Sequence, residues 1–409
     1  MKSPSSPWGS RACAALSLSI LVVASGCNLL SGVEDLRVNH LGVGGAGGEG
    51  LSGSGNSGGG STSATGNGGS ASATTGNGGS GATGTSTSTG TGVTCSPACG
   101  ANQYCEAATT TCVCNPGYVK QGNGCKAAPP GDPTTHTEQE VCDHWVKGHQ
   151  ITEQSPLTSS GAECDAGSLK QGAIVDTLVR IEAFRWLSGL GPVSDDAGLN
   201  AGAQKCANLE SWWNFNNGGS PHFPPAGSKC YTAEGAAAAG QSNIAWGSGH
   251  PAQAIDQFME DNGNATTMGH RRWILNPPLD PVGIGYWQGG GQFGNAECLS
   301  VFGGSGNGPS PPWVAMPNQG FVPVEIANWT WTFHGSIGGI ANAQISVLRV
   351  DDNTPLAVNV QTLQQGFAQE AISWTASGWQ AQPGKTYRVT VSGVGGGDVV
   401  YDVKPITCN

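Results

Sequence analysis

A long stretch near the N-terminus of this chain lacks the residues that a folded core needs. Between Gly50 and Cys105 there is no charged residue, and Gly, Ser, Thr and Ala dominate from Gly44 to about Thr94. Such a segment buries too little apolar surface to offset the conformational entropy lost on ordering it. We therefore expect residues 27–94 to be a flexible tether, with the folded part of the chain after it.

The residues before this tether have the features of an export signal. Lys2 and Arg11 form a short basic region. It precedes a largely apolar stretch, residues 14–24, which is too short to span a membrane comfortably. The sequence Val-Ala-Ser-Gly before Cys27 resembles the cleavage site of bacterial lipoproteins, where the cysteine is acylated. The resemblance implies a signal peptide over residues 1–26, lipidation of Cys27, and an exported protein anchored at the bacterial cell envelope or surface. The alternative is an ordinary secretory signal that is cut at a small residue.

The charge balance limits the partners of the chain. It has 17 Lys and Arg against 28 Asp and Glu, a net charge of −11, and no basic cluster. This composition argues against nucleic acid as a partner, because nucleic-acid binding requires clustered positive charge. We expect contact with the membrane through the lipid anchor alone.

Six cysteines fall close together after the tether: Cys95, Cys99, Cys105, Cys112, Cys114 and Cys125. A segment this short is stable only when cross-links replace a hydrophobic core, and six cysteines allow fifteen pairings. The spacing resembles an EGF-like module over residues 95–125. The resemblance implies the pairs Cys95–Cys105, Cys99–Cys112 and Cys114–Cys125, in a module that acts as a spacer or binds a partner. The acidic residues that bind calcium in some such modules are missing. We expect residues 126–136 to be a linker to the next domain.

Residues 137–304 have the alternating patterns of a mixed α/β domain. Apolar residues repeat at helical spacing from Ile174 to Phe184 and predict a first helix. A second helix is expected over about 199–213, and Pro251 is suited to open a third. Two strands are predicted after these helices, at residues 282–287 and 297–302.

Two histidines in this domain are candidates for one site. His222 lies in Ser-Pro-His-Phe-Pro, and His270 lies in Gly-His-Arg-Arg-Trp, with Gly-Gln-Ser-Asn-Ile-Ala-Trp between them. If folding brings the imidazoles together, they can bind Zn²⁺ or a similar divalent ion. Two protein ligands leave open positions and give modest affinity, so a carboxylate or water must complete the coordination. The alternative is a pair of histidines that are only hydrogen-bonded in a groove.

The order of motifs in residues 137–304 resembles the CAP superfamily of cysteine-rich secretory, antigen five and pathogenesis-related proteins. The matching segments are Arg185 with residues 189–193, residues 199–207, His222, residues 243–247, Glu260, Gly269-His270 and residues 282–285. The resemblance implies a three-layer αβα sandwich with a cleft lined by His222, Glu260 and His270. This chain departs from the family at Ser242, which stands where the first glutamate is usual. Asp261 takes the place of Glu260 if the register shifts by one.

Three functions are compatible with such a cleft. The first, which we favour, is binding of a small apolar or glycan-like ligand, a divalent metal or a partner protein. The second is hydrolysis, with Ser242 as nucleophile, a cleft histidine as base and Glu260 orienting it. Ser242 has no Gly-x-Ser-x-Gly elbow around it, which argues against the hydrolase. The third is a purely adhesive or structural surface protein.

Two arginines follow His270 directly. On a strand, Arg271 and Arg272 would point to opposite faces, with one paired and the other solvated. The alternative is that they bind a carboxylate or phosphate beside the cleft.

The remaining features concern the C-terminal part and its cross-links. We expect Cys142–Cys164 and Cys206–Cys230 as local loops, which leaves Cys298–Cys408 by elimination. From about residue 305 to 409 the helical period gives way to several short alternating stretches separated by turns. This pattern predicts an antiparallel β-sandwich of immunoglobulin or fibronectin type, serving as a spacer or a docking surface.

Overall fold

A computed structural model describes residues 95–106, 108–214, 219–292, 294–304, 306 and 308–408. The expected signal peptide, the tether and the lipidation site at Cys27 lie outside these residues. Within the described part, no helix has the length and hydropathy that a membrane span requires.

The first folded unit is a small cystine module of two hairpins. Its strands are β1 (Gln103–Glu106), β2 (Thr111–Cys114), β3 (Tyr118–Gln121) and β4 (Gly124–Ala127). The three disulfides of the module are Cys95–Cys105, Cys99–Cys112 and Cys114–Cys125, so the expected pairs are confirmed. Gly117, at a φ of +76°, lies so close to the next domain that an added Cβ would be 2.4 Å from Cβ of Pro192.

The middle domain begins with a short 3₁₀ turn and a capped helix. The turn is η3 (Pro133–Thr135), and α1 (Glu138–Gly148) starts at Thr137 with a capping box, in which Thr137 and Glu140 satisfy each other's backbone N–H groups. The other helices are α2 (Gln171–Leu187), α3 (Ala197–Glu210), α4 (Ala233–Ala239), α5 (Pro251–Glu260) and α6 (Gly269–Ile274). The strands are β5 (Leu157–Thr158), β6 (Ser168–Leu169), β7 (Ser242–Trp246), β8 (Gly283–Trp287) and β9 (Ala296–Ser300).

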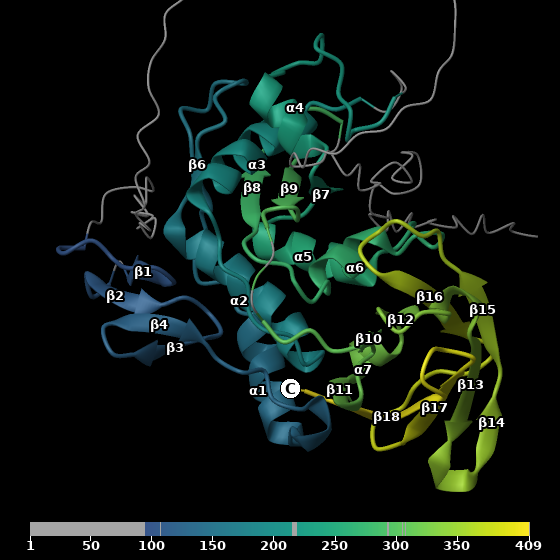
Figure 1. The fold of residues 1–409 in the computed structure, drawn as a ribbon. Coiled ribbons are helices and arrows are strands. Elements are labelled where there is room, and N and C mark those ends of the chain that lie inside the picture. The colour runs from purple at the N-terminus through teal and green to yellow at the C-terminus, as the bar shows by residue number, and fades with distance from the viewer. Residues whose placement is uncertain are drawn as a thin grey trace, which may run out of the picture.

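Helices cover both faces of the central sheet, whose antiparallel order is β7-β9-β8. Alternate residues of β9 point to opposite faces. Cys298 belongs to the hydrophobic cluster that includes α3, whereas Leu299 belongs to the cluster that includes α2 and α5. Figure 1 shows α3 and α4 on one side of this sheet and α5 and α6 on the other.

Three of the expected disulfides are wrong. The structure instead pairs Cys142 with Cys408, Cys164 with Cys230, and Cys206 with Cys298. The local-loop reasoning failed because helix-on-sheet packing brings distant cysteines together: α3 lies across β9, and α1 lies beside the C-terminal end (Figure 1).

The C-terminal region consists of two sheets. One has the order β10-β12-β16-β15, from β10 (Trp313–Met316), β12 (Trp331–Gly335), β16 (Glu370–Ala376) and β15 (Val358–Thr362). The other has the order β11-β18-β17-β13-β14, from β11 (Gly320–Pro323), β18 (Val399–Ile406), β17 (Tyr387–Ser392), β13 (Gln344–Arg349) and β14 (Thr354–Leu356). Three short helical segments connect strands: α7 (Val324–Ala327), η5 (Ile340–Asn342) and η6 (Val350–Asp352).

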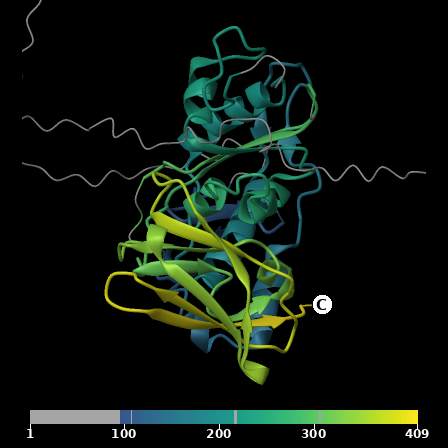
Figure 2. The ribbon, with the colours of Figure 1, turned by 90° about the vertical axis from the view of Figure 1, so that its right-hand side faces the viewer.

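Aromatic rings fill the space between these two sheets. The ring centroid of Tyr401, from β18, is 5.5 Å from that of Trp313, in β10, and 6.5 Å from that of Phe333, in β12. Figure 2 shows the strands of this region, in green and yellow, gathered below the helical part. The expectation of a wholly antiparallel sandwich is wrong for one pair, because β11 runs parallel to β18. The chain passes from β10 to the other sheet before β11, so β11 enters alongside the last strand in the same direction.

The middle domain and the C-terminal sheets share one hydrophobic core. Leu275, at the end of α6, belongs to the same buried cluster as Phe333. His334, also in β12, is fully buried there, and its Nε2 lies 3.4 Å from the carbonyl oxygen of Leu275. Burial and the positive charge of nearby Arg272 lower the pKa of His334 to about 3.

Acid is therefore expected to destabilise the protein through His334. The folded-state pKa of about 3 lies below the ordinary 6.5. As the pH falls, the imidazole therefore takes up a proton in the unfolded chain before it does so in the folded protein. The free energy of unfolding is unaffected by His334 above pH 6.5 and decreases below that pH. At about 1.4 kcal/mol for each pH unit, the loss reaches about 3 kcal/mol by pH 4.5. Urea unfolding with a chelator present measures the free energy of unfolding at pH 7 and at pH 4.5. The decrease between these two pH values should be about 3 kcal/mol smaller in His334→Gln than in the wild type. Equal decreases would contradict this account.

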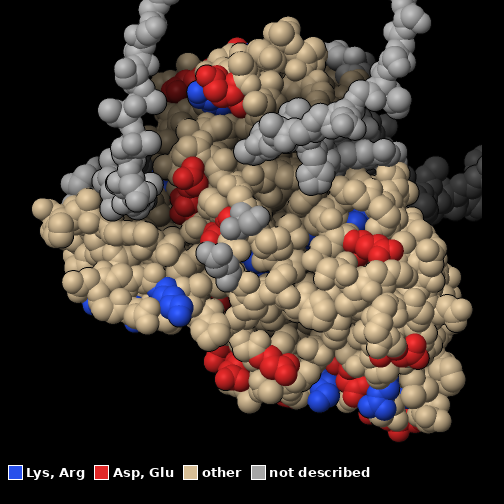
Figure 3. Space-filling view, in the orientation of Figure 1, with Lys and Arg blue, Asp and Glu red and all other residues tan. Residues whose placement is uncertain are grey.

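The surface carries few charges. On the face drawn in Figure 3, Lys and Arg are few and scattered, some of them directly beside acidic side chains, and acidic groups form small clusters.

Candidate functional site

His222 lies in the connection between α3 and α4, almost fully buried, with 1% of its surface exposed. Its Nδ1 is 2.9 Å from the carbonyl oxygen of Ala239, at the end of α4. Because a carbonyl can only accept, Nδ1 carries the proton and Nε2 keeps its lone pair. Burial lowers the pKa of His222 to about 4, although the bond to Ala239 opposes the shift. The imidazole is thus neutral near pH 7, which is the form that binds metals.

His270 is the second residue of α6 and is also buried, with 2% of its surface exposed. Its Nδ1 is 3.0 Å from Oδ1 of Asp261. Nδ2 of Asn264 lies 3.3 Å from the same ring nitrogen, so Asp261 and Asn264 together hold the ring. The neighbouring carboxylate favours the tautomer with the proton on Nδ1. Nε2 of His270 is buried and has no hydrogen-bond partner among the described residues.

Asp261, not Glu260, is therefore the carboxylate that orients His270. Asp261 is the C-cap of α5 in a left-handed conformation, with a φ of +56°, which Asp tolerates better than most residues. This turn directs its side chain inward, where it also accepts a hydrogen bond of 3.0 Å from Nδ2 of Asn264. Glu260 remains partly exposed, and its backbone carbonyl accepts a bond from Arg271. The expectation that Glu260 orients the histidine is wrong by one residue. Helix α5 ends at Glu260, and the left-handed turn at Asp261 places the next carboxylate beside His270.

Ser242 does not have the surroundings of a nucleophile. It is fully buried at the start of β7, and its Oγ donates a hydrogen bond of 2.7 Å to the carbonyl oxygen of Ala238. The hydrogen bond given by its hydroxyl in the described structure goes to this carbonyl and not to an imidazole. Its burial and this bond argue against Ser242 as the nucleophile of a hydrolase, because its hydroxyl proton is already bound to the backbone.

Arg271 and Arg272 lie on α6 rather than on a strand, and both are buried. Arg271 donates to the carbonyl oxygens of Met259, Glu260 and Thr330. Arg272 donates to three other backbone carbonyl oxygens, those of Thr267, Gln364 and Gln369. The alternating-strand prediction is wrong. Neither guanidinium is open to an anionic ligand, because both are buried and bonded to backbone carbonyls, half of which belong to the C-terminal region.

Asn243 is a site residue that the sequence reasoning did not single out. Its Nδ2 donates a hydrogen bond of 3.0 Å to the carbonyl oxygen of His270, so β7 holds α6 directly. Its Oδ1 is buried without a hydrogen-bond partner in the described structure. The signal was present in the sequence, because Asn243 opens the Asn-Ile-Ala-Trp segment that lies between the two histidines.

The two imidazoles are close enough to influence each other. The positive charge of a protonated His270 lowers the pKa of His222. Nδ1 of His222 faces a carbonyl oxygen, and Nδ1 of His270 lies beside a carboxylate as well as the amide of Asn264. The two acceptors favour protons on Nδ1, which leaves the Nε2 lone pairs for another partner. Together with Oδ1 of Asn243, the free groups are acceptors. Such a set suits a cation or a hydrogen-bond donor rather than an anion.

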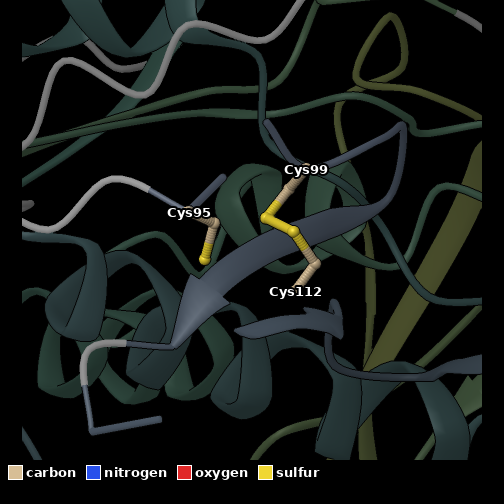
Figure 4. A group of neighbouring side chains, drawn as sticks. All are labelled: Cys95, Cys99 and Cys112. Carbon is tan, nitrogen blue, oxygen red and sulfur yellow. A yellow bond between two sulfur atoms is a disulfide. The ribbon is translucent and has the colours of Figure 1, made fainter. Parts of the chain in front are cut away.

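The cystine module holds a different group of potential metal ligands. Among the described residues, the sulfur atoms of Cys95, Cys99 and Cys112 form the single group of three or more His, Cys, Asp or Glu ligand atoms that lie within 4.8 Å of one another. Figure 4 shows the bond between Cys99 and Cys112, and Cys95 is bonded to Cys105. These sulfurs are oxidised, and a metal binds thiolates, so the group is structural.

Comparison with known protein families matches residues 178–301 to the family described as CAP: cysteine-rich secretory protein family. The matched range begins within α2, ends just after β9 and contains both histidines. No curated protein and no solved structure matches the chain. Residues 178–301 of this chain form a CAP domain.

Proposed function

We propose that the CAP domain binds a divalent metal ion such as Zn²⁺ between His222 and His270. The CAP match supports a ligand-binding or partner-binding domain of the extracellular type. The observation that carries the metal proposal is the pair of anchored rings. The carbonyl oxygen of Ala239 lies 2.9 Å from Nδ1 of His222 and Oδ1 of Asp261 lies 3.0 Å from Nδ1 of His270, which favours the tautomers that leave two Nε2 atoms as ligands. Metal-binding histidines in proteins typically have this arrangement.

The residues present fit a weakly held ion. The orphaned Nε2 of His270 needs a partner, and a divalent cation supplies one without a proton. Two imidazoles leave at least two positions of a tetrahedral ion for water or an external ligand. A bound ion would polarise a ligand that completes its coordination, while His222 and His270 hold it and Asn243 fixes α6. We accordingly favour binding of a small ligand or partner over catalysis.

The test is equilibrium dialysis of the mature protein against Zn²⁺, followed by metal analysis. The proposal predicts one Zn²⁺ for each chain, and at least a tenfold weaker affinity in His222→Ala and in His270→Ala. The control is His144→Ala, a half-buried histidine of α1 whose Nδ1 is 3.6 Å from Glu182; it should bind as the wild type does. Unchanged binding in the His222→Ala, His270→Ala double variant would overturn the proposal.

We further propose that this domain is displayed on the outside of the cell by a lipid at Cys27. The six disulfides of the described chain support an oxidising compartment, and the small residues before Cys27 support acylation. Membrane fractionation tests this: the Cys27→Ser variant should leave the membrane fraction, and its retention there would contradict anchoring by this lipid.

A further inference from the structure

Helix α6 is too short to hold itself in place. It has six residues, and isolated helices of that length are unstable in water. The position of His270 must therefore come from the groups that pack against α6. Asn243 supplies one contact from inside the CAP domain. Several of the others come from the connection between β15 and β16, residues 363–369, which we call the buttress loop.

The ring of Phe367 lies directly against the start of α6. Phe367 is fully buried, and a Cβ added at Gly269 would be 3.0 Å from its Cδ1, so the absence of a side chain at Gly269 permits the contact. The backbone N–H of Gln364 donates a bond of 2.8 Å to the carbonyl oxygen of Thr266, just before the helix. Met268 packs with Leu363 in a small buried cluster.

Arg272 ties the buttress loop to the helix from the other side. Its Nη1 donates to the carbonyl oxygens of Thr267, at 2.9 Å, and Gln364, at 2.8 Å. Its Nη2 donates to the carbonyl oxygen of Gln369. The guanidinium also lies 5.7 Å from the centre of the Phe367 ring. One side chain on α6 thus binds both ends of the buttress loop and the segment before the helix.

We infer that Phe367 and Arg272 are positioning residues for His270. Contacts from the C-terminal region thus help to set the geometry of the histidine site. Nδ1 of His270 is 3.0 Å from Oδ1 of Asp261 and 3.3 Å from Nδ2 of Asn264, and a shift of α6 by about 1 Å takes both contacts out of hydrogen-bonding range. Without the contacts of the buttress loop, the ring of His270 no longer has one fixed orientation and one favoured tautomer. The inference rests on the proposed metal site for its importance, although the ring geometry can be measured without metal.

The test uses the mature protein with ¹⁵N-labelled histidine and two variants, Phe367→Leu and Arg272→Lys. Leucine keeps the site apolar but loses the flat ring, and lysine keeps the charge but cannot bind three carbonyls in the same geometry. The matched control is Phe321→Leu, in β11, whose ring lies 5.3 Å from Nζ of Lys404 and away from α6. The readouts are the His270 ring nitrogen shifts in metal-free protein and the Zn²⁺ affinity.

The wild type and the control should show His270 with its proton on Nδ1. Phe367→Leu and Arg272→Lys should show a mixture of tautomers and bind Zn²⁺ about tenfold more weakly, as expected when a group that orients a ligand is lost. A folded variant with the wild-type tautomer would overturn the inference, and near-ultraviolet circular dichroism reports the fold. If the tautomer shifts but no protein binds Zn²⁺, the positioning effect stands and the proposed metal function fails.

Discussion

Replacing both Cys142 and Cys408 with Ser is expected to lower the free energy of unfolding by about 4 kcal/mol. This disulfide joins residues 266 positions apart, and it fastens the C-terminal end to α1. Cross-links that close long loops restrict the unfolded chain the most. The other disulfides inside the loop shorten its effective length, so we expect a value below the largest that the loop-length relation allows.

Urea unfolding followed by tryptophan fluorescence measures this loss. The matched control is Cys95→Ser with Cys105→Ser, a pair 10 residues apart in the cystine module. In that variant the cystine module should unfold. The free energy of the main unfolding transition should stay within about 1 kcal/mol of the wild-type value. A loss below about 1 kcal/mol in the Cys142, Cys408 variant would mean that the packed core alone holds the C-terminal end.

Replacing Asp261 with Asn is expected to damage both stability and metal binding. Asn has the size of Asp but no charge, and Asp261 is buried within reach of two buried arginines. Burial lowers the pKa values of Arg271 and Arg272 to about 10, and the charge of Asp261 opposes this shift in both. Removing one member of a buried charge group costs about 3 kcal/mol. The loss of the carboxylate also weakens the hold on Nδ1 of His270, so the affinity for Zn²⁺ should fall about tenfold or more.

Urea unfolding and calorimetric titration with Zn²⁺ give the two values. The control is Asp280→Asn, because Asp280 accepts bonds from the backbone and hydroxyl of Ser194 and its charge acts on another buried arginine, Arg185. That variant should lose stability but keep the wild-type affinity for Zn²⁺. If Asp261→Asn keeps both the stability and the affinity of the wild type, Asp261 is not the group that orients His270.

Local patterns in the sequence predicted local features well. Pro251 opens α5, as its fixed φ suits the first position of a helix. The cystine module pairs as the EGF-like spacing implies, because its six cysteines lie within one short segment. Both histidines of the CAP motif order are buried and anchored in the same domain.

The errors arose where tertiary packing decides. Cys206 faces Cys298 because α3 crosses β9, and no spacing rule on the chain reveals that crossing. Asp261 replaces Glu260 because α5 ends in a left-handed residue, which moves the inward-facing carboxylate by one position. Arg271 and Arg272 bind backbone carbonyls of the C-terminal region, and the sequence of the CAP domain alone contains no sign of that partner.

The most direct measurement of the central claim is an anomalous difference map from a crystal of the protein soaked in Zn²⁺. The account predicts a peak about 2.0–2.1 Å from Nε2 of His222 and Nε2 of His270, with Nδ1 of His270 still bonded to Asp261. A map without a peak between these two rings, or with zinc bound elsewhere on the chain, would contradict it.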